Sequence, residues 1–169
     1  IMVIIGICQG MQPIAGYNYG AGKPQRLKEV FIQVMKVNVL CGCLTMLIGL
    51  SIPGAMCRMF TKDIDLITMA RPAMRYLTAM MPLIALTITN SQFFISIDKP
   101  WISIVTSLSR QVIFLLPMIY IIPAVFTSLG GNGLTGLWVS CTISDVLGAA
   151  LAVSLLMTQR NIFKNARQS

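Results

Sequence analysis

Two charged residues lie within apolar stretches of this 169-residue chain, and they are the groups most able to do chemistry there. Arg110 lies about 15 Å along a helix from Pro100, and Asp145 lies about 18 Å from Met157. A charge at membrane depth costs about 2.5 to 3.5 kcal/mol on insertion scales, so each needs a partner or a task. Three interpretations are open: a structural ion pair between neighbouring helices, an Asp145 that responds to a cation or proton, or an Asp145 that faces a wet cavity without a partner.

Uncharged polar side chains form a second group within the apolar stretches. Amides in hydrocarbon either hydrogen-bond to a neighbouring helix or line a polar cavity. Prolines in the same stretches favour a cavity, because broken helices leave carbonyl groups that membranes tolerate only beside protein or water. The candidate substrate- or ion-binding residues are Asp145, Arg110, Gln9, Gln12, Thr89, Asn90 and Gln92, with Phe93 and Tyr120 as candidate ligand surfaces.

The composition argues against several other kinds of chemistry. The chain has no histidine, and its five cysteines are too scattered for a disulfide framework or a zinc site. No nucleophile, base and orienting group occur together, so we expect no enzyme activity, no cofactor and no bound metal. The net charge of +8 would suggest a nucleic acid partner in a soluble chain. Here the cations gather in short connections, as expected next to lipid headgroups, so no nucleic acid partner is expected.

The elements that position these residues are apolar enough for a membrane. Hydrophobic residues make up 56% of the chain and charged residues 11%, against roughly 25% charged in a soluble domain. A helix needs about 20 apolar residues to cross a hydrocarbon core of about 30 Å. The sequence therefore predicts an all-α polytopic membrane protein with five transmembrane helices, over about 1–20, 30–52, 76–97, 101–126 and 134–157.

Charge placement predicts the orientation of these spans. Alternate threading puts seven cations on one side and four on the other, so the positive-inside rule places the seven-cation side in the cytoplasm. The polar tail, residues 158–169, is expected on that cytoplasmic side. The protein as a whole is expected in an inner or plasma membrane. Segment 63–75 mixes charged and apolar residues and predicts an amphipathic helix on the outer surface, before the chain turns into the bilayer. Pro72 and Pro82 predict bends in the helical pattern that begins at Asp63. The cytoplasmic cations are Lys23, Arg26, Lys28, Lys99, Arg160, Lys164 and Arg167, and the outer ones are Arg58, Lys62, Arg71 and Arg75.

Several motifs resemble one transporter family. Residues 9–13 read Gln-Gly-Met-Gln-Pro, residues 16–21 read Gly-Tyr-Asn-Tyr-Gly-Ala, and a basic connection follows. This pattern resembles the eighth transmembrane helix and the following loop of the multidrug and toxic compound extrusion (MATE) family. The likeness continues in order through Ser91–Phe94, Ser107–Gln111, Gly133–Trp138 and Ile143–Asp145.

The resemblance implies the C-terminal lobe of a twelve-helix antiporter, five helices of a six-helix bundle. The resemblance also implies the activity of this family, which exports organic cations or other amphipathic drugs in exchange for Na⁺ or H⁺ by alternating access. The implied partners are the lipid bilayer, these small molecules, and an N-terminal lobe of the same chain. Some branches carry an acidic residue three positions before the glutamine of the tenth helix, where this chain has Thr89. Without an acid at that position, the residue that couples Na⁺ or H⁺ entry to drug export would be Asp145 or a residue of the N-terminal lobe.

Two other functions fit the same pattern of spans. A flippase or exporter of lipid-linked sugars in the same superfamily should have a more cationic cleft, to match pyrophosphate. A non-transporting membrane scaffold or channel piece should pack a dry interior. The chain opens at Ile1 within an apolar run, without an initiator Met, so we expect a truncated sequence. The spacing of Gly6 with Gly10, and of Gly16 with Gly20, predicts close helix packing.

Overall fold

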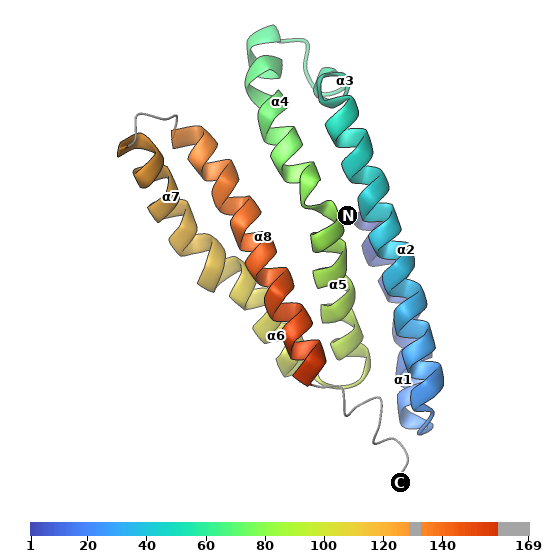
Figure 1. The fold of residues 1–169 in the computed structure, drawn as a ribbon. Helices are drawn as coiled ribbons and strands as arrows, with labels where there is room; N and C mark the ends of the chain where they lie inside the picture. Colours follow the sequence, from blue (N-terminus) through green and yellow to red (C-terminus); the bar gives the residue numbers. More distant parts are fainter. Residues whose placement is uncertain (129–132, 159–169) are drawn as a thin grey trace.

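Helices make up every regular element that the computed structural model describes, which covers residues 1–128 and 133–158 (Figure 1). This confirms the predicted all-α fold class. Residues 130–132 of the predicted glycine loop, and residues 159–169 of the predicted tail with its three cations, lie outside the described residues. In chain order the elements are α1 (Met2–Gly20), α2 (Pro24–Ser51), α3 (Pro53–Arg58), α4 (Ile64–Ala79), α5 (Met81–Ser96), α6 (Pro100–Leu108), the π-helix η1 (Ser109–Leu115), α7 (Leu116–Ser128) and α8 (Gly133–Thr158).

Three helical stretches in the described ranges are long and apolar enough to cross a membrane: α2, the continuous run from α6 through η1 to α7, and α8. The helices α4 and α5 together would form a fourth span, with a bend of 47° between them. The 19-residue α1 is not among these spans, because polar residues such as Gln9, Gln12 and Asn18 lower its hydropathy. The count of five spans therefore stays a prediction.

Prolines and two left-handed residues set the turns between helices. A proline begins α2, α3 and α6, where its missing N–H would have had no helical partner. Gly22 has a φ of 63° in the turn between α1 and α2, and Asp98 has a φ of 57° in the turn between α5 and α6. Both are tight reversals, so consecutive helices run antiparallel, and these two turns lie at the same end of the molecule (Figure 1).

The segment predicted as a separate surface helix is part of a longer element. Asp63 caps α4 by accepting from the backbone N–H of Asp65 at 3.0 Å, and the helix then continues to Ala79. It contacts α2, α3 and α8 along its length. The break at Met80 comes directly before Pro82, whose ring disfavours an unbroken helix, whereas Pro72 lies inside α4. The outer-surface position of 63–75 stays a prediction.

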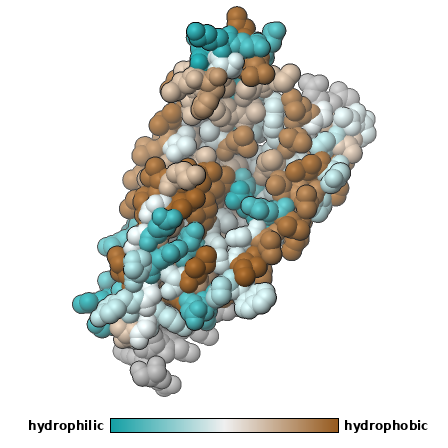
Figure 2. All heavy atoms as spheres, turned by 180° about the vertical axis from the view of Figure 1, so that it is seen from behind, coloured by the Kyte–Doolittle hydropathy of each residue, from teal (hydrophilic) through white to brown (hydrophobic). Residues whose placement is uncertain are grey.

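The apolar core lies where α1, α2 and α5 meet. It contains Met11 and Ala15 from α1, Leu27 and Phe31 from α2, and Phe93, Phe94 and Ile97 at the end of α5. A second group consists of α6, η1, α7 and α8, which pack against one another, and α7 has no buried residue. Seen from behind, apolar residues cover much of the surface between hydrophilic regions at the upper end and lower left (Figure 2). Such a surface suits lipid, which replaces water as the solvent for apolar side chains.

The helices α2 and α5 approach each other closely at a glycine. A Cβ atom added to Gly42 would lie 2.9 Å from the Met81 carbonyl oxygen. The predicted glycine pairs of α1 behave differently, because Cβ atoms added at Gly6, Gly10 or Gly20 would meet no described atom within 4 Å. Only Gly16 of that set packs closely, at 3.2 Å from the Ser96 carbonyl oxygen. The prediction of close packing at those three glycines is therefore wrong for the described part of the chain.

Candidate functional site

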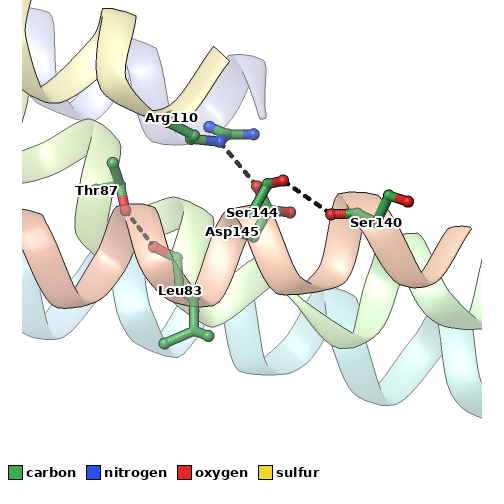
Figure 3. A network of polar contacts seen from close by, with 6 residues as sticks. All are labelled: Leu83, Thr87, Arg110, Ser140, Ser144 and Asp145. Atoms are coloured by element: carbon green, nitrogen blue, oxygen red, sulfur yellow. Dashed lines mark hydrogen bonds and ion pairs between the residues drawn. The ribbon is translucent and has the colours of Figure 1, made fainter. Parts of the chain in front are cut away.

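Arg110 and Asp145 form an ion pair between η1 and α8. The Arg110 Nε atom donates to Asp145 Oδ1 at 2.8 Å, and the two side chains are 28% and 11% exposed (Figure 3). Of the three open interpretations, this contact agrees with an ion pair between neighbouring helices and excludes an Asp145 without a partner. Pairing offsets part of the cost of removing each charge from water, and truncating either partner would leave the other uncompensated.

Local backbone features place the two side chains. Arg110 lies in the π-helical segment that precedes Pro117, and π-helical turns within longer helices occur frequently at functional sites. On α8, Gly148 leaves room for the arginine stem, since a Cβ added there would lie 3.1 Å from Arg110 Cγ. The Ser140 hydroxyl donates to the Met118 carbonyl at 2.9 Å, which ties α8 to α7 beside the pair.

Two neighbouring cavities share Arg110 as a wall. One, of about 470 Å³, is lined by Asp145 and Ser144 from α8, by Arg110 and Gln111 from η1, and by residues of α4 and α5. The other, of about 370 Å³, lies among α1, α5 and η1 and also includes Arg110 and Gln111. A cavity beside a buried ion pair is where a small cation could reach the carboxylate.

The predicted polar constellation divides into separate contacts. The Gln12 amide nitrogen donates to Gln92 Oε1 at 2.8 Å, joining α1 to α5, and Gln92 also lines the 370 Å³ cavity. Gln9 is exposed on α1. Thr89 and Asn90 are fully buried, and the Asn90 amide donates to the Ala152 carbonyl of α8 at 2.6 Å. The structure thus brings Gln12 and Gln92 together and puts Thr89 and Asn90 between helices.

Asn38 is a buried polar residue that the sequence analysis missed. Its amide nitrogen donates to Thr89 Oγ1 at 2.8 Å and to Cys8 Sγ at 3.2 Å, so three helices meet at this cluster. Its Oδ1 atom has no hydrogen-bond partner in the described structure, and neither has Oδ1 of Asn90. The signal was present, because Asn38 is an amide in the charge-free part of its span, the pattern that marked Asn90.

The two aromatic candidates, Phe93 and Tyr120, have different surroundings. Phe93 is fully buried, with its ring centroid 4.4 Å from that of Phe31, so it belongs to the apolar core and offers no free surface to a ligand. Tyr120 is 77% exposed on α7, a helix without buried residues. Neither lines the cavities beside Arg110.

Apolar helices around a partly buried ion pair and two cavities define a polytopic helical membrane protein. The MatE family profile matches residues 1–121, most of the chain. The chain belongs to the MatE family of membrane transporters, as the sequence motifs predicted. A search of curated proteins finds no match.

Solved structures agree with this assignment. The chain is 38% identical, over 95% of its length, to the MATE multidrug transporter DinF-BH solved in complex with R6G, with a TM-score of 0.84. Two solved structures described as a multidrug resistance MATE family transporter of the MOP superfamily share the fold at lower identity. One is in an inward-facing conformation (18% identity, 99% of this chain, TM-score 0.86) and the other in an outward-facing conformation (16%, 95%, 0.83). The chain spans 34% to 38% of the length of these three transporters.

Proposed function

We propose that this chain is part of a secondary active exporter that moves organic cations or amphipathic drugs out of the cell in exchange for Na⁺ or H⁺. The observation that carries the proposal is the Arg110–Asp145 pair in a chain of the MatE family: the buried Asp145 carboxylate lines the 470 Å³ cavity, and Arg110 lines both cavities. The family resemblance to multidrug transporters supports the substrate class. The protein is proposed as a transporter, with no chemical step of its own.

Asp145 is the proposed coupling residue. A proton or Na⁺ at its carboxylate would weaken the bond from Arg110 and change the cost of burying both side chains. An ion can shift a conformational equilibrium only through such a difference in affinity between two states. Binding at Asp145 would therefore change which packing of η1 against α8 is preferred, and with it the side to which the cavity opens.

The other predicted binding residues take two proposed roles. Gln92 borders the cavity that Arg110 also lines, and Gln12, bonded to it, orients it as a polar surface for the transported compound. Gln9 is exposed on α1 and is proposed to face the cleft toward an N-terminal lobe. Thr89 and Asn90 are proposed to join helices, because the Thr89 hydroxyl bonds Asn38 of α2 and the Asn90 amide nitrogen bonds the Ala152 carbonyl of α8.

The proposed setting is a cell membrane with the lipid bilayer around the helices. The turns carrying Lys23 and Lys99 lie at one end of the molecule, which the positive-inside rule assigns to the cytoplasm together with the tail (Figure 1). The cleft would be completed by an N-terminal lobe of the same protein. Its small-molecule partners are amphipathic or cationic compounds.

The test of coupling is Asp145→Asn in the full-length transporter, with Asp98→Asn as the control. Asp98 is an exposed carboxylate in the turn before α6, and asparagine tolerates its left-handed backbone. We expect Asp145→Asn to lower drug resistance and ion-driven drug efflux from cells while its amount in the membrane stays near that of wild type. Asp98→Asn should keep both. Normal efflux by Asp145→Asn would reduce Asp145 to a structural partner of Arg110.

The two alternatives predict different interiors. A flippase for lipid-linked sugars needs several cations for pyrophosphate, and Arg110 is the one cation lining the two cavities beside the ion pair in the described chain. A scaffold should exclude small reagents from its interior. Cys141 lines the 470 Å³ cavity, whereas Cys8 is fully buried, so Cys141 carries this test. Alkylation of Cys141 by a small polar maleimide supports a transporter, and no reaction under any condition favours a scaffold.

A further inference from the structure

Arg110 has more hydrogen-bonding capacity than its ion pair uses. Its Nε atom donates to Asp145, and no other hydrogen bond of this side chain forms among the described residues. A guanidinium carries its remaining N–H donors on the two terminal nitrogens, in a fixed fork that matches a carboxylate. The ion pair therefore leaves the carboxylate-binding edge of Arg110 unoccupied.

The 370 Å³ cavity lies against Arg110 on a side that excludes the acidic partner. Arg110 lines this cavity and Asp145 does not, and Arg110 is the one charged residue in its described lining. Ile5, Ile84 and Ile88 supply apolar walls. A positive group at one side of a largely apolar pocket is the arrangement that holds the charged end of an amphipathic anion.

Gln92 adds a second donor to the same cavity. Its Oε1 atom accepts from Gln12 at 2.8 Å, so the amide nitrogen is the group left for a ligand. That nitrogen has no hydrogen-bond acceptor in the described structure. Arg110 and Gln92 thus each keep an unused donor at this cavity, and the Gln111 amide beside them adds another donor together with an acceptor. The charged donor is Arg110, which matches an anionic ligand group.

We propose that this cavity is a subsite for an amphipathic organic anion, whose carboxylate binds the terminal nitrogens of Arg110. Its apolar body would lie against the isoleucines of α1 and α5. Bidentate arginine–carboxylate pairs are about twice as strong as neutral hydrogen bonds and are directional. The inference rests on the proposed export function and extends its substrates beyond organic cations, since Asp145 and Arg110 would each attract one sign of charge.

The experiment compares two probes of equal size and opposite charge, 4-phenylbutyrate and 4-phenylbutylammonium. Their binding to the purified full-length transporter in lipid nanodiscs is measured by equilibrium dialysis. Wild type should bind the carboxylate, and Asp145→Asn should bind it several-fold tighter, because the negative charge beside Arg110 no longer repels the ligand. Adding Arg110→Gln to Asp145→Asn should weaken 4-phenylbutyrate binding about tenfold or more, without weakening 4-phenylbutylammonium binding.

The double variant leaves a neutral pair, so it avoids burying an unpaired carboxylate. Arg75→Gln in the Asp145→Asn background is the matched control, since Arg75 is an exposed cation of α4 that lines neither cavity, and it should bind like Asp145→Asn alone. Ser107→Leu, which narrows the cavity from α6 while keeping the ion pair, should also abolish carboxylate binding.

Three outcomes would overturn the subsite: no carboxylate binding by wild type and Asp145→Asn, equal binding with and without Arg110, or an equal loss of both probes. Binding that survives Ser107→Leu unchanged would equally place the ligand elsewhere. These readouts are independent of coupling. Normal efflux by Asp145→Asn would remove the proposed coupling role and leave the binding comparison intact.

Discussion

Thr87 and Thr89 are neighbours on α5 that look alike in the sequence and differ in their contacts. Each is buried, and each hydroxyl donates to the carbonyl one helical turn earlier, Thr87 to Leu83 at 3.0 Å and Thr89 to Ala85 at 2.8 Å. Thr89 alone also accepts from Asn38 of α2, at 2.8 Å. At the residue scale, then, a buried hydroxyl joins helices only when a hydrogen-bond partner from another helix reaches it, as Asn38 reaches Thr89.

This difference predicts unequal costs for the same substitution. Thr89→Val should lower the free energy of unfolding of the full-length transporter by about 1 kcal/mol, because it removes the Asn38 acceptor inside the protein. Thr87→Val removes only a contact within its own helix and should stay within about 0.5 kcal/mol of wild type. Unfolding by SDS titration measures both. Equal costs would show that the Asn38 contact contributes nothing measurable.

At the scale of elements, backbone proximity decides which helices can pack. Contacts between α2 and α5 bury Gly42 against the Met81 carbonyl, at the point where α4 breaks into α5. Without a hydrophobic driving force between helices in lipid, close backbone approach and van der Waals contact supply much of the association energy. The stability of the bend should therefore depend on the absence of a side chain at Gly42.

Gly42→Ala should destabilise the transporter by about 1 to 3 kcal/mol, because the added methyl group meets backbone atoms that cannot rotate away. Gly10→Ala is the control, since its Cβ would meet no described atom within 4 Å, and alanine also favours the helix. The same SDS titration compares the two variants. A Gly42→Ala protein as stable as Gly10→Ala would mean that α2 and α5 shift apart at no cost.

A second element, η1, links backbone irregularity to the candidate site. Its π-helical segment, Ser109–Leu115, contains Arg110 and ends just before Pro117. Proline cannot donate the backbone hydrogen bond that a regular helix needs from that position. The irregular turn thus sets the direction in which Arg110 leaves the helix, toward α8.

At the scale of the whole molecule, α4 and α5 are together long and apolar enough to cross the membrane as one bent span. With a 47° bend, the pair fits either a broken span or a re-entrant loop by length and composition. Figure 1 draws the two helices end to end, with the α4 start and the α5 end at opposite ends of the molecule. This arrangement favours a span.

Labelling from the two sides of the membrane tests this arrangement. In the full-length transporter, Lys62→Cys before α4 and Asp98→Cys after α5 should react with a membrane-impermeant maleimide from opposite sides. Because the natural cysteines would add signal, they are first replaced by serine, and the cysteine-free protein gives the background. Labelling of both positions from one side would make α4 and α5 a re-entrant pair. Lys28→Cys should label from the same side as Asp98→Cys.

The sequence by itself determined the fold class and the approximate helices, because hydropathy over about 20 residues depends on composition alone. It also determined the family, because the motifs at residues 9–13 and 16–21 are read directly from residue order. It also allowed a contact between Arg110 and Asp145, since both lie at similar depth on consecutive antiparallel spans, and left open whether the two charges pair. It failed for Phe93, for the glycines of α1 and for Asn38. Their roles depend on which face of a helix meets a neighbour, and a single chain's pattern does not specify that face when lipid and core are equally apolar.

Only the tertiary structure decided which polar groups are hydrogen-bonded to another helix and which keep free donors. Depth along a helix follows from residue number, but the partner of each donor follows from the rotation and bend of every helix around it. The Thr89 hydroxyl and the Asn90 amide nitrogen are bonded between helices, whereas Arg110 keeps free donors beside a cavity. The free donors of Arg110 became visible only once α5, η1 and α8 had been placed in space, because each helix turns through about 100° per residue and a small change in register re-aims every side chain.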